Sequence, residues 1–129
     1  MLKTVLTSEL KKHFPNKNIQ FGGGDDVIAT IPPIHHSWKP IVICYDEDEV
    51  TVFYGDFTHK HFGYYGESIE VEVQAQSIAT DVIEAMTPVF EDRLEFYKRL
   101  GSGGFRVRGS QGQLSKFLFG ENGVVWSGN

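Results

Sequence analysis

Cysteine is nearly absent from this sequence, since Cys44 is the only one among 129 residues. A single thiol excludes an intramolecular disulfide, so an apolar core must hold the fold together. Cys44 lies within the apolar run 41–45, where we expect a buried thiol with a raised pKa and no nucleophilic role. The cysteine content therefore indicates neither an oxidising compartment nor thiol chemistry.

Long hydrophobic runs are also missing. No stretch of the chain approaches the roughly 20 apolar residues that a membrane-spanning helix needs. Residues 1–14 contain four charged side chains and no continuous apolar core, so we expect no secretory signal there. These absences, together with the lone cysteine, predict a cytoplasmic protein that does not insert into a membrane.

Basic side chains are outnumbered, with 12 Lys and Arg against 17 Asp and Glu and a net charge of −5. That sign argues against binding to nucleic acid or to an anionic membrane, because both attract a positive surface. The charge is uneven, since residues 1–92 hold fifteen of the carboxylates and residues 93–116 hold six basic residues and only Glu95. The basic stretch is either a solvated face or a patch, including Arg106 and Arg108, that binds phosphate or an acidic partner.

Motifs of common enzymes and nucleotide-binding proteins are lacking. The glycine run 22–24 leads into two aspartates and a strand pattern, which predicts a hairpin turn and not a phosphate-binding loop. The acidic run 46–49 lacks the ligand spacing of a Ca²⁺ loop and is typical of a solubilising hairpin tip. No serine lies in a G-x-S-x-G setting. We therefore expect a protein without enzymatic activity.

The patterns that are present predict an α+β fold. Residues 2–14 have the three- and four-residue apolar spacing of an amphipathic helix, which Pro15 ends. Residues 39–65 contain three short strand patterns joined by tight turns, which predicts an antiparallel meander. Helical spacing recurs from about 73 to 100 and predicts one long helix that Pro88 kinks or divides.

Weaker signals complete the expected fold. Further short strands are predicted at 19–21, 27–31, 105–108 and 124–126. Residues 69–73 fit either a strand or the start of a helix, and the type of segment 114–119 stays open. We expect a single domain over residues 1–129, with a mainly antiparallel sheet of about five to seven short strands packed against both helices.

The clearest candidate ligands are two histidines. His59 and His61 are two residues apart on a predicted strand, so both side chains point to one face and could bind Zn²⁺ or a similar metal. Asp56 precedes them in a turn and is a candidate third ligand, and His35 and His36 could approach from a loop. The alternative is that the pair is structural or lies on the surface, because one such pair is a weak signal. On that interpretation the protein needs no cofactor.

Aromatic side chains near predicted strand ends are candidate contacts with a protein partner, because Tyr and Trp are enriched among the residues that dominate binding energy. They are Trp38, Tyr54, Tyr64, Tyr65 and Trp126. The alternative is that they close the ends of a small core. Our leading hypothesis is a non-enzymatic protein-binding module, such as an acidic immunity-type or regulatory protein, or one that associates with itself through an exposed edge strand. One alternative is a metal-binding protein or a metal-dependent enzyme with its site around His59 and His61. The other is a domain that binds a small ligand in a pocket between the sheet and the long helix.

Overall fold

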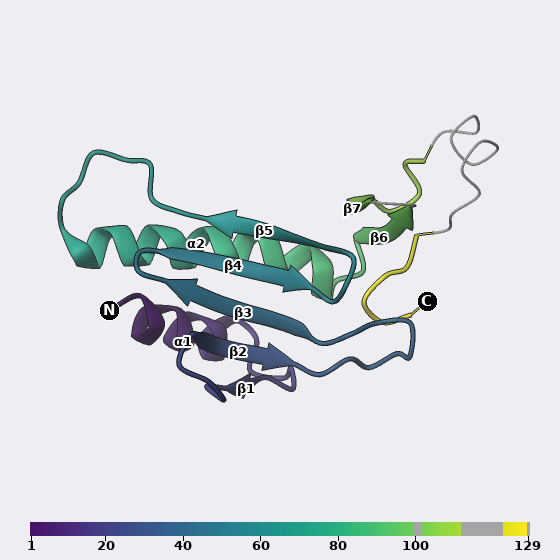
Figure 1. The fold of residues 1–129 in the computed structure, drawn as a ribbon, viewed down its shortest axis with the longest axis horizontal. Coiled ribbons are helices and arrows are strands. Elements are labelled where there is room, and N and C mark those ends of the chain that lie inside the picture. The colour runs from purple at the N-terminus through teal and green to yellow at the C-terminus, as the bar shows by residue number, and fades with distance from the viewer. Residues whose placement is uncertain (100–101, 112–122, 129) are drawn as a thin grey trace.

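The computed structural model describes residues 1–99, 102–111 and 123–128. Its elements in chain order are α1 (Leu2–His13), β1 (Gln20–Phe21), β2 (Val27–Ile31), β3 (Ile41–Asp46), β4 (Glu49–Tyr54), β5 (Thr58–Phe62), α2 (Val71–Phe90), β6 (Leu94–Arg99) and β7 (Ser102–Val107). Strands β1 to β5 form one antiparallel sheet in chain order, and β6 and β7 form a separate antiparallel hairpin (Figure 1). The predicted α+β fold and its central meander are confirmed.

Both helices lie on the same side of the five-stranded sheet (Figure 1). The alternating apolar residues of the strands explain this arrangement, because successive side chains point to opposite faces. The helix-facing residues of β3 and β4 include Ile41, Ile43, Val50 and Val52, and all four are fully buried. The alternate side chains form what we call the open face. Its members on β3, β4 and β5 are Val42, Cys44, Asp46, Glu49, Thr51, Phe53, His59 and His61.

Cys44 differs from its expected position. The thiol lies on the open face and is half-buried, not enclosed within the core, because β3 is covered by helices on one side only. The predicted direction of its pKa shift is confirmed. Partial burial raises the pKa of the Cys44 thiol, and the negative charge of Asp26 raises it further. The thiol is therefore protonated at neutral pH and is a poor nucleophile.

The first helix agrees with its prediction. Its buried residues are Leu2, Leu6 and Leu10, which share one stripe at four-residue spacing. That stripe packs on α2 and β2. Within the described part of the chain, neither α1 nor α2 combines the length and the apolar character that crossing a membrane requires.

The second helix is shorter than predicted. It ends at Phe90, and the segment expected to continue it to about residue 100 is strand β6. Pro88 lies inside the last turn, and the chain then leaves the helix at Asp92, which has a left-handed φ of 57°. A bond from the Arg93 amide to the Pro88 carbonyl (2.9 Å) closes this turn. The kink at Pro88 stays a prediction. At the other end, the ambiguous residues 69–73 resolve as a helix that begins at Val71.

The hairpin β6–β7 replaces the predicted end of the helix and extends the short strand predicted at 105–108. Residues 102–104, which follow the predicted end of the helix near residue 100, belong to β7. The strand predicted at 124–126 is reduced to a single bridge, in which Val124 and Phe96 exchange two backbone hydrogen bonds of 2.8 Å. Segment 114–119 lies outside the described residues.

Gly103 sets how closely this hairpin approaches the main sheet. A Cβ atom at position 103 would overlap the backbone carbonyl oxygen of Phe57, just before β5. We predict that Gly103→Ala lowers the free energy of unfolding by about 2 kcal/mol, because backbone atoms of two elements would have to separate. The matched control is Gly24→Ala, whose added methyl would meet only the side chain of Val27 at 3.3 Å. Equal urea midpoints for the two variants would contradict the prediction.

Candidate functional site

Eight exposed carboxylates gather at one end of the molecule, which we call the acidic end. They are Asp25, Asp26, Asp46, Glu47, Asp48, Glu67, Glu70 and Glu72. They come from three separate turns, which join β1 to β2, β3 to β4, and β5 to α2. Among the described residues, none of the eight forms an ion pair within the chain. Their charge is therefore available to an external cation or a basic protein surface.

The topology of the sheet brings these turns together. The amide of Tyr45 donates to the carbonyl of Asp26 (2.9 Å), which places the β1–β2 turn beside the end of β3. One hollow is lined by both Asp48 and Tyr65, so the β3–β4 turn lies beside the β5–α2 loop. A second hollow is lined by Glu47 together with Val71 from the start of α2. Antiparallel connections separated widely in sequence thus converge on one surface.

Helix α2 favours negative charge at this end. Its first turn exposes backbone N–H groups whose dipoles point toward the acidic end, and these stabilise nearby carboxylates. Glu70 occupies the N-cap position and Glu72 lies in the first turn. Ser68 stabilises the loop that leads into α2, because its hydroxyl accepts a hydrogen bond from the Glu70 amide (3.1 Å). The helix therefore offsets part of the mutual repulsion of the carboxylates.

Exposed apolar side chains accompany the carboxylates. Ile69 is 91% exposed, Tyr65 89% and Val71 57%, and Met1 and Val73 are also exposed. Folding leaves these side chains in water, since the buried stripe of α2 begins only at Ala75. Contiguous exposed apolar side chains are a common feature of protein–protein contact surfaces. We call these five the apolar fringe of the acidic end.

Three of the five predicted aromatics belong to the core. Trp38 is 3% exposed, and its indole Nε1 donates to the Val125 carbonyl (2.9 Å). Its ring makes edge contacts with Phe57, Phe96 and Trp126 at centroid distances of 4.8–4.9 Å. Tyr54 is 2% exposed. The alternative interpretation, in which the aromatics close the ends of the core, matches the buried positions of Trp38, Tyr54 and Trp126.

The other two predicted aromatics lie in the β5–α2 loop, at the acidic end. The hydroxyl oxygen of Tyr64 accepts a hydrogen bond from the Ser68 amide (2.9 Å), which fixes the loop. Gln74 fastens the same loop from α2, because its Nε2 donates to the Ser68 carbonyl (2.8 Å). Tyr65 projects into solvent. Of the five predicted aromatics, Tyr65 is the one whose side chain is exposed.

The predicted basic residues lie at the opposite end of the sheet, on or beside the β6–β7 hairpin. Nε of Arg106 donates to Oε1 of Glu95 (2.7 Å), and the guanidinium stacks on Tyr97 at 4.6 Å from the ring centroid. Both members of that ion pair are mostly covered, with side-chain exposures of 14% and 13%. Arg108 is exposed and continues the hairpin, since its amide donates to the carbonyl of Arg93 (2.9 Å). Arg106 therefore supports the hairpin, and the two arginines are not presented together.

The predicted metal ligands are brought together only in part. His59 and His61 share the open face, with ring centroids 5.1 Å apart. Asp56 instead accepts a hydrogen bond from Lys98, which lowers the pKa of the Asp56 carboxyl. The rings of His35 and His36 lie together in the connection between β2 and β3, with their centroids 4.2 Å apart. Within the described part of the chain, no group of three or more His, Cys, Asp or Glu residues is placed to hold a metal ion.

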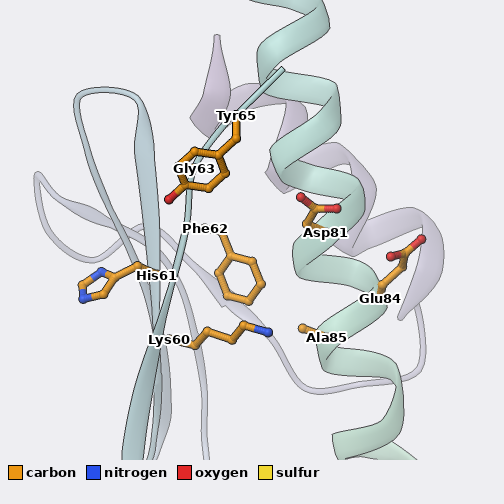
Figure 2. Close-up of a pocket in the computed structure, with 8 residues that line it drawn as sticks. All are labelled: Lys60, His61, Phe62, Gly63, Tyr65, Asp81, Glu84 and Ala85. Atoms are coloured by element: carbon orange, nitrogen blue, oxygen red, sulfur yellow. The ribbon is translucent and has the colours of Figure 1, made fainter. Parts of the chain in front are cut away.

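A hollow of about 430 Å³ lies between β5 and α2, where a small-ligand pocket was predicted. Figure 2 shows Lys60 and Phe62 on its strand side, with Asp81 and Glu84 on its helix side. The ammonium of Lys60 lies over the Phe62 ring, 5.3 Å from its centroid. The hollow is open to solvent and mixed in charge, and a ligand for it stays a prediction.

Sequence reasoning missed the acidic end as a surface. It treated the acidic run 46–49 and the turn at 25–26 as separate hairpin tips, because no local pattern links them. Ile69 and Val73 were read as part of an alternating or helical apolar pattern. The available signal was that the acidic runs at 25–26 and 46–49 fall in every second connection between consecutive strands. An antiparallel sheet places every second connection at the same end. Comparisons with protein-family models, curated proteins and solved structures found no match for this chain.

Proposed function

We propose that this chain is a cytoplasmic, non-enzymatic protein-binding module whose acidic end docks on a basic surface of a partner protein. The observation that carries the proposal is the combination of eight exposed carboxylates and an exposed apolar fringe at one end of the fold. An acidic protein that neutralises a basic toxin, or a regulatory protein acting on a basic target, are two versions of this function. Self-association is a separate matter and does not depend on this surface.

The two parts of the surface have different energetic roles. Exposed carboxylates steer a basic partner toward the surface and accelerate association, but each contributes little to final affinity. Apolar side chains such as Tyr65 and Ile69 lose their contact with water on binding and supply most of the free energy. The concentrated negative charge of these carboxylates also disfavours acidic partners, because like charges would be brought together. The surface therefore selects a partner that is both basic and partly apolar.

The partner can be captured by photo-crosslinking from Tyr65. A benzophenone amino acid at this position, 89% exposed, should crosslink one protein in extracts of the native source. The same probe at Val107, which is 64% exposed on the β6–β7 hairpin, is the matched control. The captured protein is then purified and its affinity measured directly. We expect a basic protein, because the carboxylates around Tyr65 select for one.

Charge reversal tests the acidic end quantitatively. Glu47→Lys combined with Asp48→Lys should weaken binding of the purified partner at least about tenfold at low salt, because two attractive charges become repulsive. The control Glu84→Lys combined with Glu91→Lys makes the same change in net charge at exposed positions in α2 and at its C-cap, outside the acidic end. The difference should shrink at high salt, where exposed charges are screened. Equal affinities of the two double variants, or a Tyr65 crosslink no different from that at Val107, would refute the proposed function.

A further inference from the structure

The two histidines of β5 form a half-complete ligand set on the open face. Their positions two residues apart on one strand place both rings on the same side of the sheet. The rings are nearly perpendicular, at an interplanar angle of 78°, and both residues are exposed. Figure 2 shows His61 pointing away from the hollow that holds Lys60 and Phe62. The imidazoles therefore face open solvent and do not pack against either helix.

His61 is held in the orientation of a metal ligand. Its Nδ1 lies 2.9 Å from Oε1 of Glu49 and 2.8 Å from the hydroxyl of Thr51, both on the neighbouring strand β4. In the tautomer with its proton on Nδ1, His61 donates that proton to the Glu49 carboxylate, and the lone pair on Nε2 is left for a metal. Histidines that bind metals commonly donate their second ring nitrogen to a carboxylate in this way, which fixes the ring and raises its basicity.

One copy of the chain cannot complete such a site. Zinc bound by histidine is usually four-coordinate, and the described residues offer no third ligand beside this pair. Strand β5 is the last in the sheet order, so beyond the contact that β7 makes near Phe57 it presents an edge to which another strand can be added. If a second β5 is placed antiparallel and centred on Lys60, His59 of each copy lies opposite His61 of the other. Directly opposed side chains in such pairs have Cβ atoms about 4.5–5.5 Å apart, so four imidazoles converge.

We propose that a transition-metal ion, of which zinc is the best fit, bridges two copies of this chain through His59 and His61 of each. The arrangement is a two-fold dimer in which both copies present the same surface. Four neutral imidazoles suit zinc, whereas Mg²⁺ and Ca²⁺ prefer oxygen ligands. Glu49 orients His61 in both copies and is a positioning residue. This inference does not depend on the acidic end or on a basic partner.

Lys60 is the group that this arrangement must accommodate. It lies between the two histidines and points to the helix side of the sheet, so the two copies bring their Lys60 side chains opposite one another. Like charges in that position are destabilising. The hollow beside β5 is also lined by Asp81 and Glu84 on α2, so each copy has two carboxylates on the same side of the sheet as Lys60 (Figure 2). Their negative charge reduces the repulsion between the two ammonium groups, and the metal stays on the opposite face.

The test is a titration of the tag-free full chain with Zn²⁺, followed by sedimentation velocity and native mass spectrometry. We expect a monomer in EDTA and a dimer with one zinc ion per two chains once zinc is added. His59→Ala and His61→Ala should each abolish zinc-dependent dimerisation. Glu49→Gln should raise the zinc concentration at half-dimerisation by about 10- to 100-fold, because the orienting carboxylate is lost. A short amine-reactive crosslinker should join Lys60 to Lys60 only when zinc is present.

His36→Ala is the matched control, since His36 is exposed in another part of the chain and should leave the titration unchanged. The altered side chains are on the surface, and thermal unfolding of each variant in EDTA checks that it is folded. The inference is overturned if zinc leaves the chain monomeric, if one zinc binds per chain without dimerisation, or if a dimer forms regardless of zinc and of both histidine substitutions.

Discussion

Replacing Trp38 by alanine is expected to lower the free energy of unfolding by about 4 kcal/mol, because a large buried ring is removed and a cavity is left. The ring contacts three other aromatic side chains and is 3% exposed, so the surroundings cannot collapse freely around it. The loss of the indole donor also leaves the Val125 carbonyl without its bond from Nε1. Urea denaturation at neutral pH measures the change.

A matched control separates this effect from any disturbance of the loop. Ile34→Ala changes a side chain that is 65% exposed only four residues earlier, and surface substitutions usually stay within about 0.5 kcal/mol. Trp126 is the other tryptophan of the chain and gives a second readout. Because Trp38 ties residues 123–128 to the sheet, its loss should shift the Trp126 emission toward that of a solvated indole. A Trp38→Ala variant less than about 1 kcal/mol weaker than the control would show that Trp38 does not anchor this part of the core.

Elements with a strong local pattern were predictable from the sequence. The leucine stripe of α1 and the alternating residues of β3 and β4 each match one period, and turns with Gly, Asp or Pro separate them. The glycine turn between β1 and β2 is a good example. Gly22 and Gly23 have φ values of 80° and 98°, which other residues rarely adopt, so the hairpin needs glycine there.

The segment after Pro88 was mispredicted because its apolar residues fit both the helical and the strand periodicity. Leu94 and Tyr97 continue the helical spacing of α2, yet Leu94 and Phe96 also alternate as in a strand. Distant contacts decide between them. Phe96 is fully buried with its ring against Trp38, and its backbone forms two hydrogen bonds with the backbone of Val124. A pairing partner so far along the chain leaves no trace in a local pattern, which is why periodicity alone extended the helix.

The candidate site was predictable in its parts and not as a whole. Tyr65 and the histidine pair were identified from residue type and position, but Trp38 and Tyr54 have the same residue types and are buried. Burial depends on whether a strand end meets another element, and here the β6–β7 hairpin covers one end of the sheet and not the other (Figure 1). The end without that cover is the acidic end.

The burial of Tyr54 predicts a loss of stability at alkaline pH. Removal from water raises the pKa of Tyr54 to about 12, whereas an unfolded chain has a tyrosine pKa of about 10. Between these values the unfolded state releases the phenolic proton and the folded state keeps it. The free energy of unfolding therefore falls as the pH rises from about 10 to about 12, and is unaffected below that range. The contribution lost is about 3 kcal/mol.

Tyr54→Phe keeps the ring contacts with Phe96 and Phe105 and removes the ionisable group. Urea midpoints measured between about pH 9 and pH 12 should therefore fall less steeply for this variant than for the unaltered chain. Tyr65→Phe is the control, because the same chemical change at a side chain that is 89% exposed should not alter the slope. Other lysines and tyrosines titrate in all three proteins, so only the difference between slopes reports on position 54. If all three slopes agree, the Tyr54 hydroxyl must ionise in the folded protein as it does in water.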